Sequence, residues 1–457
     1  MSIQIIGFIL IPLGIFVFFK NTRYLLLLTV FFSSFTATSV INIGDFSLLP
    51  SYYFGILFII KNIFIVMKNK MVVKYDKFLG FFIILCVFSL IMPKILERNN
   101  ITIMNQDSIW VNLAFTSNNI TQILYLLFCF AIYWFSKDYL YHNQSEIENV
   151  IKILIYSSTV ICLLGFYQEI AYIKGWEFNK FFRNAIHGNV QGLVGFVRVY
   201  SVTQEPSMLA YFLAPILALS IPLDEKILKH KMLFALLIIS TGILSTSTTF
   251  IVGILALIIK IILDKCIALI SLNRKKINKQ KIGYILPFIS FIFIVCLIFL
   301  INVNPIIKDT LIDGTINKFY ANNQSGMERT STFTMHLNVA LKHPILGVGF
   351  GSARSKDLLS TWLCNVGILA TGVFMLYIGK IILKLNNNNK LGYGISNFLF
   401  VLFVCAFISV PEAYYLFIWL MFAVGEILII NNKYADVYQN KITQWENTTN
   451  KFKLEGN

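Results

Sequence analysis

The sequence predicts an all-α, polytopic integral membrane protein, and its composition and the length of its apolar runs support that prediction. Apolar residues make up 57% of the 457 residues, charged residues only 13%, and the mean hydropathy is +0.72. Soluble domains carry roughly 25% charged residues, so this chain is too poor in charge to be one. Its apolar runs of about 16 to 23 residues have the length that an α-helix needs to cross a bilayer.

About 12 to 13 such runs follow one another along the chain, bounded by lysine, asparagine or proline. We expect the spans at residues 3–19, 24–41, 51–67, 78–92, 120–136, 150–172, 207–223, 232–247, 248–264, 284–302, 358–380, 394–410 and 414–431. No cation precedes the first apolar core and no small-residue cleavage site follows it, so we expect a span there rather than a signal peptide. Residues 1–457 are expected to form a single membrane domain.

Basic residues gather in alternate connections between the expected spans, and this pattern predicts their orientation. We place these connections on the cytoplasmic side, because loops rich in lysine and arginine are retained there. They begin at Lys20, Lys68, Asp224, Asn273 and Lys384, and the tail at residues 432–457 joins them. The same bias explains the net charge of +16 without a nucleic-acid partner.

The orientation places two long polar loops, residues 173–206 and 303–357, together on the external face. Both flanks of residues 232–264 are basic, which predicts a helical hairpin turning near the STSTT sequence at residues 245–249. Four spans then separate the two loops, so they share one side of the membrane. Connections this long are usually functional or disordered, and their glycines and aromatic residues favour function. A third external stretch, residues 93–119, receives no assigned role.

Glu205 follows the first loop and directly precedes an apolar helix that starts with Pro206, a residue well suited to the first helical position. One interpretation is that Glu205 simply caps this helix near the positive end of its dipole. The other is that a partly desolvated carboxylate, with Arg198 close by and Ser207 beyond it, acts as a general base or positions a hydroxyl group. The residues leave both interpretations open.

The second loop contains an expected external helix from Thr330, because Phe333 and Leu337 recur at helical spacing and Pro344 follows its end. Arg329 stands at the start of this helix. A cation there opposes the helix dipole, so we expect it to bind an anion or to pair with a neighbouring carboxylate.

A glycine-rich sequence, GVGFG at residues 347–351, follows this helix. It is either a tight turn back to the membrane or a nest of backbone amides, centred on Gly349, that faces phosphate. Arg354 and Lys356 follow at once and favour the anion-binding interpretation. His336 and His343 lie seven positions apart and give only a weak metal signal. The seven cysteines show no CxxC spacing. We therefore expect neither a metal nor another cofactor.

The order and spacing of these motifs resemble the O-antigen polymerase and O-antigen ligase superfamily. The resemblance rests on Arg198, the EPS sequence at residues 205–207, and Arg329 in an external helix. It continues through HPILGVGFGS at residues 343–352 and the helix that begins LSTWLCNV at residue 359. Together these motifs cover about 90 residues of the chain.

The resemblance implies glycosyl transfer from undecaprenyl-diphosphate-linked oligosaccharides at the external face of the bacterial cytoplasmic membrane, without nucleotide sugar, metal or other cofactor. It also implies pathway partners, a chain-length regulator and a flippase. Ligases of the superfamily usually carry a histidine, often followed by asparagine, after the glycine-rich loop and shortly before the next helix. This sequence has Ser355, Lys356 and Asp357 there. That difference favours a polymerase over a ligase that moves glycan to lipid A core.

Physical chemistry agrees with the implied reaction. Arginine neutralises a departing diphosphate bidentately, so we expect Arg198, Arg329 and Arg354 to hold the donor. Glu205 would activate the acceptor hydroxyl, which predicts inversion, although a carboxylate could also serve as the nucleophile of a retaining route. The remaining expected binding residues are Ser207, His343, Gly349 and Lys356. A flippase or transporter for the same lipids is the alternative from a different class.

Overall fold

The computed structural model describes residues 2–44, 46–68, 73–106, 108–185, 192–193, 196–270, 324–386, 388–411 and 413–432. The expected span 284–302, residues 303–323 of the second long loop, and residues 433–457 of the tail lie outside the described residues.

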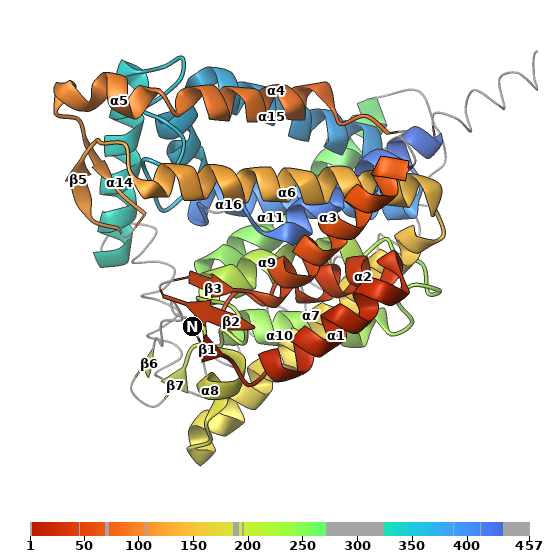
Figure 1. The fold of residues 1–457 in the computed structure, drawn as a ribbon. Helices are drawn as coiled ribbons and strands as arrows, with labels where there is room; N and C mark the ends of the chain where they lie inside the picture. Colours follow the sequence, from red (N-terminus) through yellow and green to blue (C-terminus); the bar gives the residue numbers. More distant parts are fainter. Residues whose placement is uncertain are drawn as a thin grey trace, which may run out of the picture.

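The described chain is mostly helical, as expected for a multi-pass membrane protein (Figure 1). Among the described residues, six helical segments are long and apolar enough to cross a membrane: α3 (Pro50–Lys68), Lys77–Asn99, α6 (Ser117–His142), α7 (Glu146–Lys174), α15 (Leu358–Asn386) and α16 (Lys390–Ser409). The second of these comprises α4 (Lys77–Ser89), α5 (Met92–Leu96) and the short helix η1 (Glu97–Asn99).

The other apolar helices are α1 (Gly7–Lys20), α2 (Thr22–Phe32), α9 (Pro206–Ser220), α10 (Lys231–Leu244), α11 (Thr248–Ile270) and Leu416–Asn432. Two further helices lie in the long loops: α8 (Phe178–Phe182) and α14 (Gln324–Lys342). The expected break within residues 232–264 is present, because α10 and α11 are separate helices on either side of residues 245–247.

One expected span is shorter than the sequence indicated. Helix α2 ends at Phe32, whereas we expected a span to residue 41. Residues 33–39 read SSFTATS, and serine and threonine side chains compete with helical hydrogen bonds by bonding to nearby backbone. Ser33 Oγ donates to Val30 O at 2.7 Å, and Thr38 Oγ1 donates to Phe182 O at 2.6 Å. This segment is therefore a buried loop that contacts the first long loop.

Short antiparallel strands lie at one end of the bundle, with α5, α8 and α14 (Figure 1). They are β1 (Ser2–Ile3), β2 (Ile41–Ile43) and β3 (Phe46–Leu48) in one sheet, the pair β4 (Thr102–Met104) and β5 (Trp110–Asn112), and the pair β6 (Gly192–Leu193) and β7 (Phe196–Val197). We call this end, where α6, α9, α11 and α15 begin, the loop end.

Helix α9 is the centre of the bundle. Each of its residues except Ser207 is buried, and it packs against α10, α11 and α16. A helix that is apolar all round has no preferred exposed face, so it gains most from complete enclosure by other helices. Its first residues therefore reach the loop end from the middle of the bundle.

At the opposite end, a network of buried polar side chains joins α6, α15 and the helix Leu416–Asn432. Tyr133 Oη and Tyr377 Oη donate to the two carboxylate oxygens of Glu426 at 2.7 and 2.9 Å. Lys137 forms an ion pair with the same carboxylate, and both side chains are at least nine-tenths buried. The carboxylate is thus neutralised and hydrogen-bonded, which a buried charge requires.

We expect Lys137→Met to destabilise the protein by about 3 to 5 kcal/mol, because it leaves the Glu426 charge buried without its cation. The double variant Lys137→Met/Glu426→Gln should recover most of that loss, since the glutamine can accept from one tyrosine hydroxyl, donate to the other, and carries no charge. Thermal unfolding of the detergent-solubilised protein measures both. Lys390→Met, which removes an exposed ion pair with Asp224, is the control and should change stability by about 1 kcal/mol or less. A double variant as unstable as the single one contradicts this account.

Candidate active site at the loop end

Glu205 occupies the N-cap position of α9, with extended backbone angles of φ −142° and ψ 156°. Its carbonyl oxygen accepts from the amides of Met208 and Leu209, both at 3.1 Å. The carboxylate makes no capping hydrogen bond to the helix, and instead accepts from Ser207 Oγ at 3.1 Å. The backbone of Glu205 therefore begins the helix, while its side chain does not perform the capping function that the simpler interpretation assigned to it.

Arg198 is held against the turn between α10 and α11. Its Nε donates to Thr246 Oγ1 at 2.8 Å and to Ser245 O at 3.3 Å, and its Nη2 donates to Thr246 O at 3.1 Å. Burial lowers the pKa of the Arg198 guanidinium, while the negative charge of Glu205 raises it. Arginine stays protonated through such shifts, so a fixed positive charge lies within the electrostatic reach of Glu205.

The backbone near Arg198 adopts an unusual conformation at two places, one in the α10–α11 turn and one three residues after Arg198. Thr246 has φ +47° and Ser201 has φ +51°, values that are rare outside glycine and costly for the β-branched threonine. Gln168 of α7 stabilises the second place: its Oε1 accepts from the amides of Tyr200 and Ser201 at 3.1 and 2.8 Å. Side-chain hydrogen bonds thus hold both strained places: Arg198 itself bonds to Thr246, and Gln168 bonds to the amide of Ser201.

Arg329 comes from α14 in the second long loop. Its Nη1 lies 3.4 Å from Ser409 O at the end of α16, and its buried Nε has no hydrogen-bond partner among the described residues. Burial lowers the pKa of Arg329, and the negative charges of Glu205 and Asp357 raise it. Glu205 therefore acts on guanidinium groups from two segments that are 131 positions apart in the sequence (329 − 198).

Asp357 is a site residue to which we assigned no role from the sequence. It is 5% exposed and precedes α15, where its Oδ1 accepts from the Ser360 amide at 2.8 Å. Its Oδ2 accepts from Ser360 Oγ at 2.6 Å and from Ser355 Oγ at 3.1 Å. An aspartate directly before an apolar helical run is a common N-cap signal and could have identified it.

The glycine-rich sequence forms a tight turn whose amides bond to protein acceptors. The amide of Val348 donates to Cys364 O and that of Gly349 to Asn365 O, each at 2.8 Å. Gly349 has φ +109°, and a Cβ atom there would lie 2.4 Å from the ring of Pro93. This geometry favours the tight-turn interpretation over a phosphate-binding nest, and it gives Gly349 a packing role.

The stretch 93–119 covers this turn with the β4–β5 hairpin. The backbone amide of Arg354 donates to Met104 O at 2.8 Å, and the side-chain Nη1 of Arg354 donates to Gln106 O at 3.2 Å. Arg354 therefore anchors the hairpin, whereas Arg198, Glu205, Ser207 and Arg329 gather at the start of α9.

The two other expected binding residues are half-buried. Lys356 adjoins Asp357, and the carbonyl of His343 accepts from the Gly347 amide at 3.1 Å.

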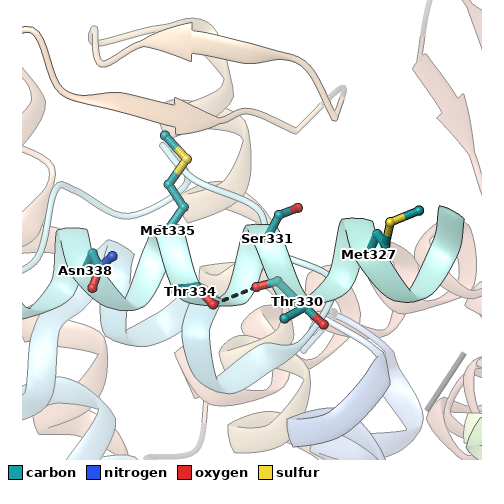
Figure 2. A pocket seen from close by; sticks show the side chains of 6 residues that line it. All are labelled: Met327, Thr330, Ser331, Thr334, Met335 and Asn338. Carbon is teal, nitrogen blue, oxygen red and sulfur yellow. Dashed lines mark hydrogen bonds between the residues drawn. The ribbon is translucent and has the colours of Figure 1, made fainter. Parts of the chain in front are cut away.

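Helix α14 presents two different faces. On one, His336 is buried, and its Nε2 accepts from the Met104 amide at 3.2 Å. Burial lowers the pKa of His336 to about 4, so the ring is neutral at physiological pH. On the other face, Figure 2 shows the uncharged side chains that line a groove of about 510 Å³: Met327, Thr330, Ser331, Thr334, Met335 and Asn338.

The described residues include no cluster of three histidine, cysteine or acidic side chains that could hold a metal ion. The arrangement that remains is a carboxylate flanked by two cations, which suits an anionic ligand that carries a reacting hydroxyl or glycosyl group. Comparison with family models, curated proteins and solved structures finds no match to this chain.

The buried histidine predicts that packing at the loop end weakens in acid. The pKa of His336 falls from 6.5 to about 4 on folding, so the unfolded chain binds more protons between these values. The contribution of the neutral His336 to the free energy of unfolding is therefore complete above about pH 6.5. It is lost as the pH falls toward 4, and the total loss is on the order of 3 kcal/mol. Hydrogen exchange of residues 102–112 should quicken as the pH falls from about 6.5 toward 4, after correction for intrinsic rates.

His336→Gln is the matched control, because a glutamine oxygen can accept the same hydrogen bond without titrating. Its exchange should show no such pH dependence. Equal pH dependence in both proteins would show that another group is responsible.

Proposed function

We propose that this protein is a polysaccharide polymerase, a glycosyltransferase that joins undecaprenyl-diphosphate-linked oligosaccharide repeat units into a surface polysaccharide such as O-antigen. The observation that carries the proposal is that Glu205, at the start of α9, acts electrostatically on two buried arginines, Arg198 and Arg329. Two arginines match the negative charge of a lipid diphosphate, and one carboxylate matches an acceptor hydroxyl group. The resemblance of the surrounding motifs to O-antigen polymerases supports the same activity.

The proposal includes an orientation. The chain would cross the bacterial cytoplasmic membrane about 12 to 13 times, with the loop end on the external or periplasmic side. The connections after α1, α3, α9 and α15, which are rich in lysine, lie at the opposite end of these helices and would face the cytoplasm. The two long loops would then meet the lipid-linked substrate after its transport across the membrane.

In the proposed reaction, the diphosphate of the growing-chain donor lies against Arg198 and Arg329. The acceptor hydroxyl oxygen of an incoming repeat unit forms a bond to the anomeric carbon, while the bond from that carbon to the diphosphate oxygen breaks. The lipid diphosphate leaves with the electron pair, and the hydroxyl proton passes to Glu205. The guanidinium groups stabilise the charge that develops on the leaving group, where fixed cations contribute most.

The opposite end of the bundle supports an enzyme over a flippase or transporter. Alternating access requires a pathway that opens toward each side of the membrane in turn. Polar contacts tie several helices together at that end: Lys137 of α6 pairs with the buried Glu426, and Lys380 of α15 pairs with Asp76 before α4. Asn386 of α15 bonds to both members of the Lys260–Asp264 pair in α11. Opening there would separate buried charges at high cost. A chain-length regulator and a pathway flippase remain proposed partners, on the resemblance alone.

The decisive assay uses purified protein in liposomes with extracted lipid-linked repeat units as the only substrate. A polymerase should give a ladder of lengthening lipid-linked glycans, because donor and acceptor are the same molecule. A ligase should give products only when lipid A core is added. Movement of the substrate across the bilayer without any ladder would instead identify a transporter.

In the same assay, Glu205→Gln should lower the polymerisation rate by about 10²- to 10⁴-fold, because glutamine keeps the size of the side chain and cannot accept the proton. Arg329→Ala should also abolish the ladder, and Arg329→Lys should restore only part of it, because lysine lacks the bidentate geometry. The controls are Glu177→Gln and Arg98→Ala, exposed residues near the same end, which should behave like the unmodified protein. Full-length ladders from both site variants would refute the assigned roles.

A further inference from the structure

Arg183 is a buried cation in the first long loop that the reaction does not use. It is 6% exposed, and its guanidinium lies 3.8 Å from the ring centroid of Tyr200. Its Nε donates to Thr203 O at 3.3 Å and its Nη2 donates to Gln204 O at 2.8 Å. Each of these acceptors is a backbone carbonyl in the short segment that leads directly into Glu205.

The bond to Gln204 O has a direct geometric consequence. A peptide unit is planar, so the Gln204 carbonyl, the Glu205 amide and the Glu205 Cα lie in one plane. Fixing the carbonyl therefore fixes the plane from which the Glu205 side chain departs. Thr203 Oγ1 adds a second constraint, because it donates to Tyr200 O at 2.7 Å and to Glu205 O at 3.0 Å.

Both ends of this arrangement are anchored in the bundle. The guanidinium of Arg183 stacks on the Tyr200 ring, and the Tyr200 amide donates to Gln168 Oε1 of α7 at 3.1 Å. On the other side of Arg183, the Ser39 amide donates to Asn184 Oδ1 at 2.7 Å, and the Ala185 amide donates to Ala37 O at 3.0 Å. The position of Arg183 is therefore set by α7 and by the buried loop after α2.

We propose that Arg183 is a positioning residue, which aims the carboxylate of Glu205 through the Gln204 peptide and does not bind substrate itself. This inference rests on the proposed role of Glu205 as the base. Arginine suits the task because its planar guanidinium can stack on a ring and donate to two carbonyls at once. Lysine keeps the charge but loses the stacking plane and the paired donors.

The kinetic test compares Arg183→Lys with Lys180→Ala, which removes an exposed cation three positions away in the same loop. We expect Arg183→Lys to lower kcat about 10- to 100-fold with KM for lipid-linked repeat units within about twofold, because a displaced base slows the chemical step more than binding. Lys180→Ala should change neither. A rise in KM with unchanged kcat would identify Arg183 as a substrate ligand and overturn the proposal.

Tyr200→Phe and Tyr200→Leu provide a second pair that leaves Arg183 in place. The phenylalanine variant keeps the ring face under the guanidinium and should retain most of kcat, whereas the leucine variant should lose it by a factor similar to that of Arg183→Lys. Equal activity of the two would contradict the proposed stacking role.

Hydrogen exchange tests the geometry without any requirement for activity. In Arg183→Lys, amides in residues 202–210 should exchange at least about tenfold faster than in Lys180→Ala, with unchanged protection in α7 and α16. Unchanged exchange in that peptide would refute the positioning role even if polymerisation is observed. Conversely, an unmodified protein that gives no ladder refutes the proposed polymerase, while the exchange result still decides whether Arg183 orders the segment before Glu205.

Discussion

The complete enclosure of α9 is the constraint on which the candidate site depends. A helix buried on every side cannot rotate or slide without disturbing α10, α11 and α16 together. The residue directly before it is Glu205, so the carboxylate starts from the end of a helix that is buried among other helices. Its charged neighbours are each held by a helix end: Arg198, in the loop before α9, bonds to the α10–α11 turn, and Arg329, in α14, lies against the end of α16.

Polar side chains, more than secondary structure, give the loop end its shape. Gln168, Asn119 and Asn365 each bond to backbone groups far away in the sequence and so take the place of strand or helix hydrogen bonds. Such residues are expensive to bury unless their partners are in place, which makes a single loop conformation favourable. The same requirement explains why two residues other than glycine can keep positive φ angles beside Arg198.

The sequence was sufficient to predict long apolar helices and the helix break near residue 245, because apolar length and basic flanks are local properties. It failed at α2, where hydroxyl side chains end the helix early. It could not distinguish a turn from a phosphate nest at Gly349, because that depends on Pro93 and Asn365, which are distant in the chain. The positions of Arg183 and Asp357 were missed for the same reason: burial of a charge is visible only once its partners are known.

The left-handed Gly367 within α15 divides that helix into two parts with different attachments. A Cβ atom there would lie 2.4 Å from Ile345 O and 2.5 Å from Pro344 O, so only glycine fits. Residues before the kink bond to the glycine-rich turn through Cys364 and Asn365, whereas the residues after it extend to Asn386 within the bundle. The outer part thus belongs to the loop end by its contacts. Sequence changes that reshape the loop end can therefore accumulate on one side of a single residue, while the packing of the helical bundle on the other side stays the same.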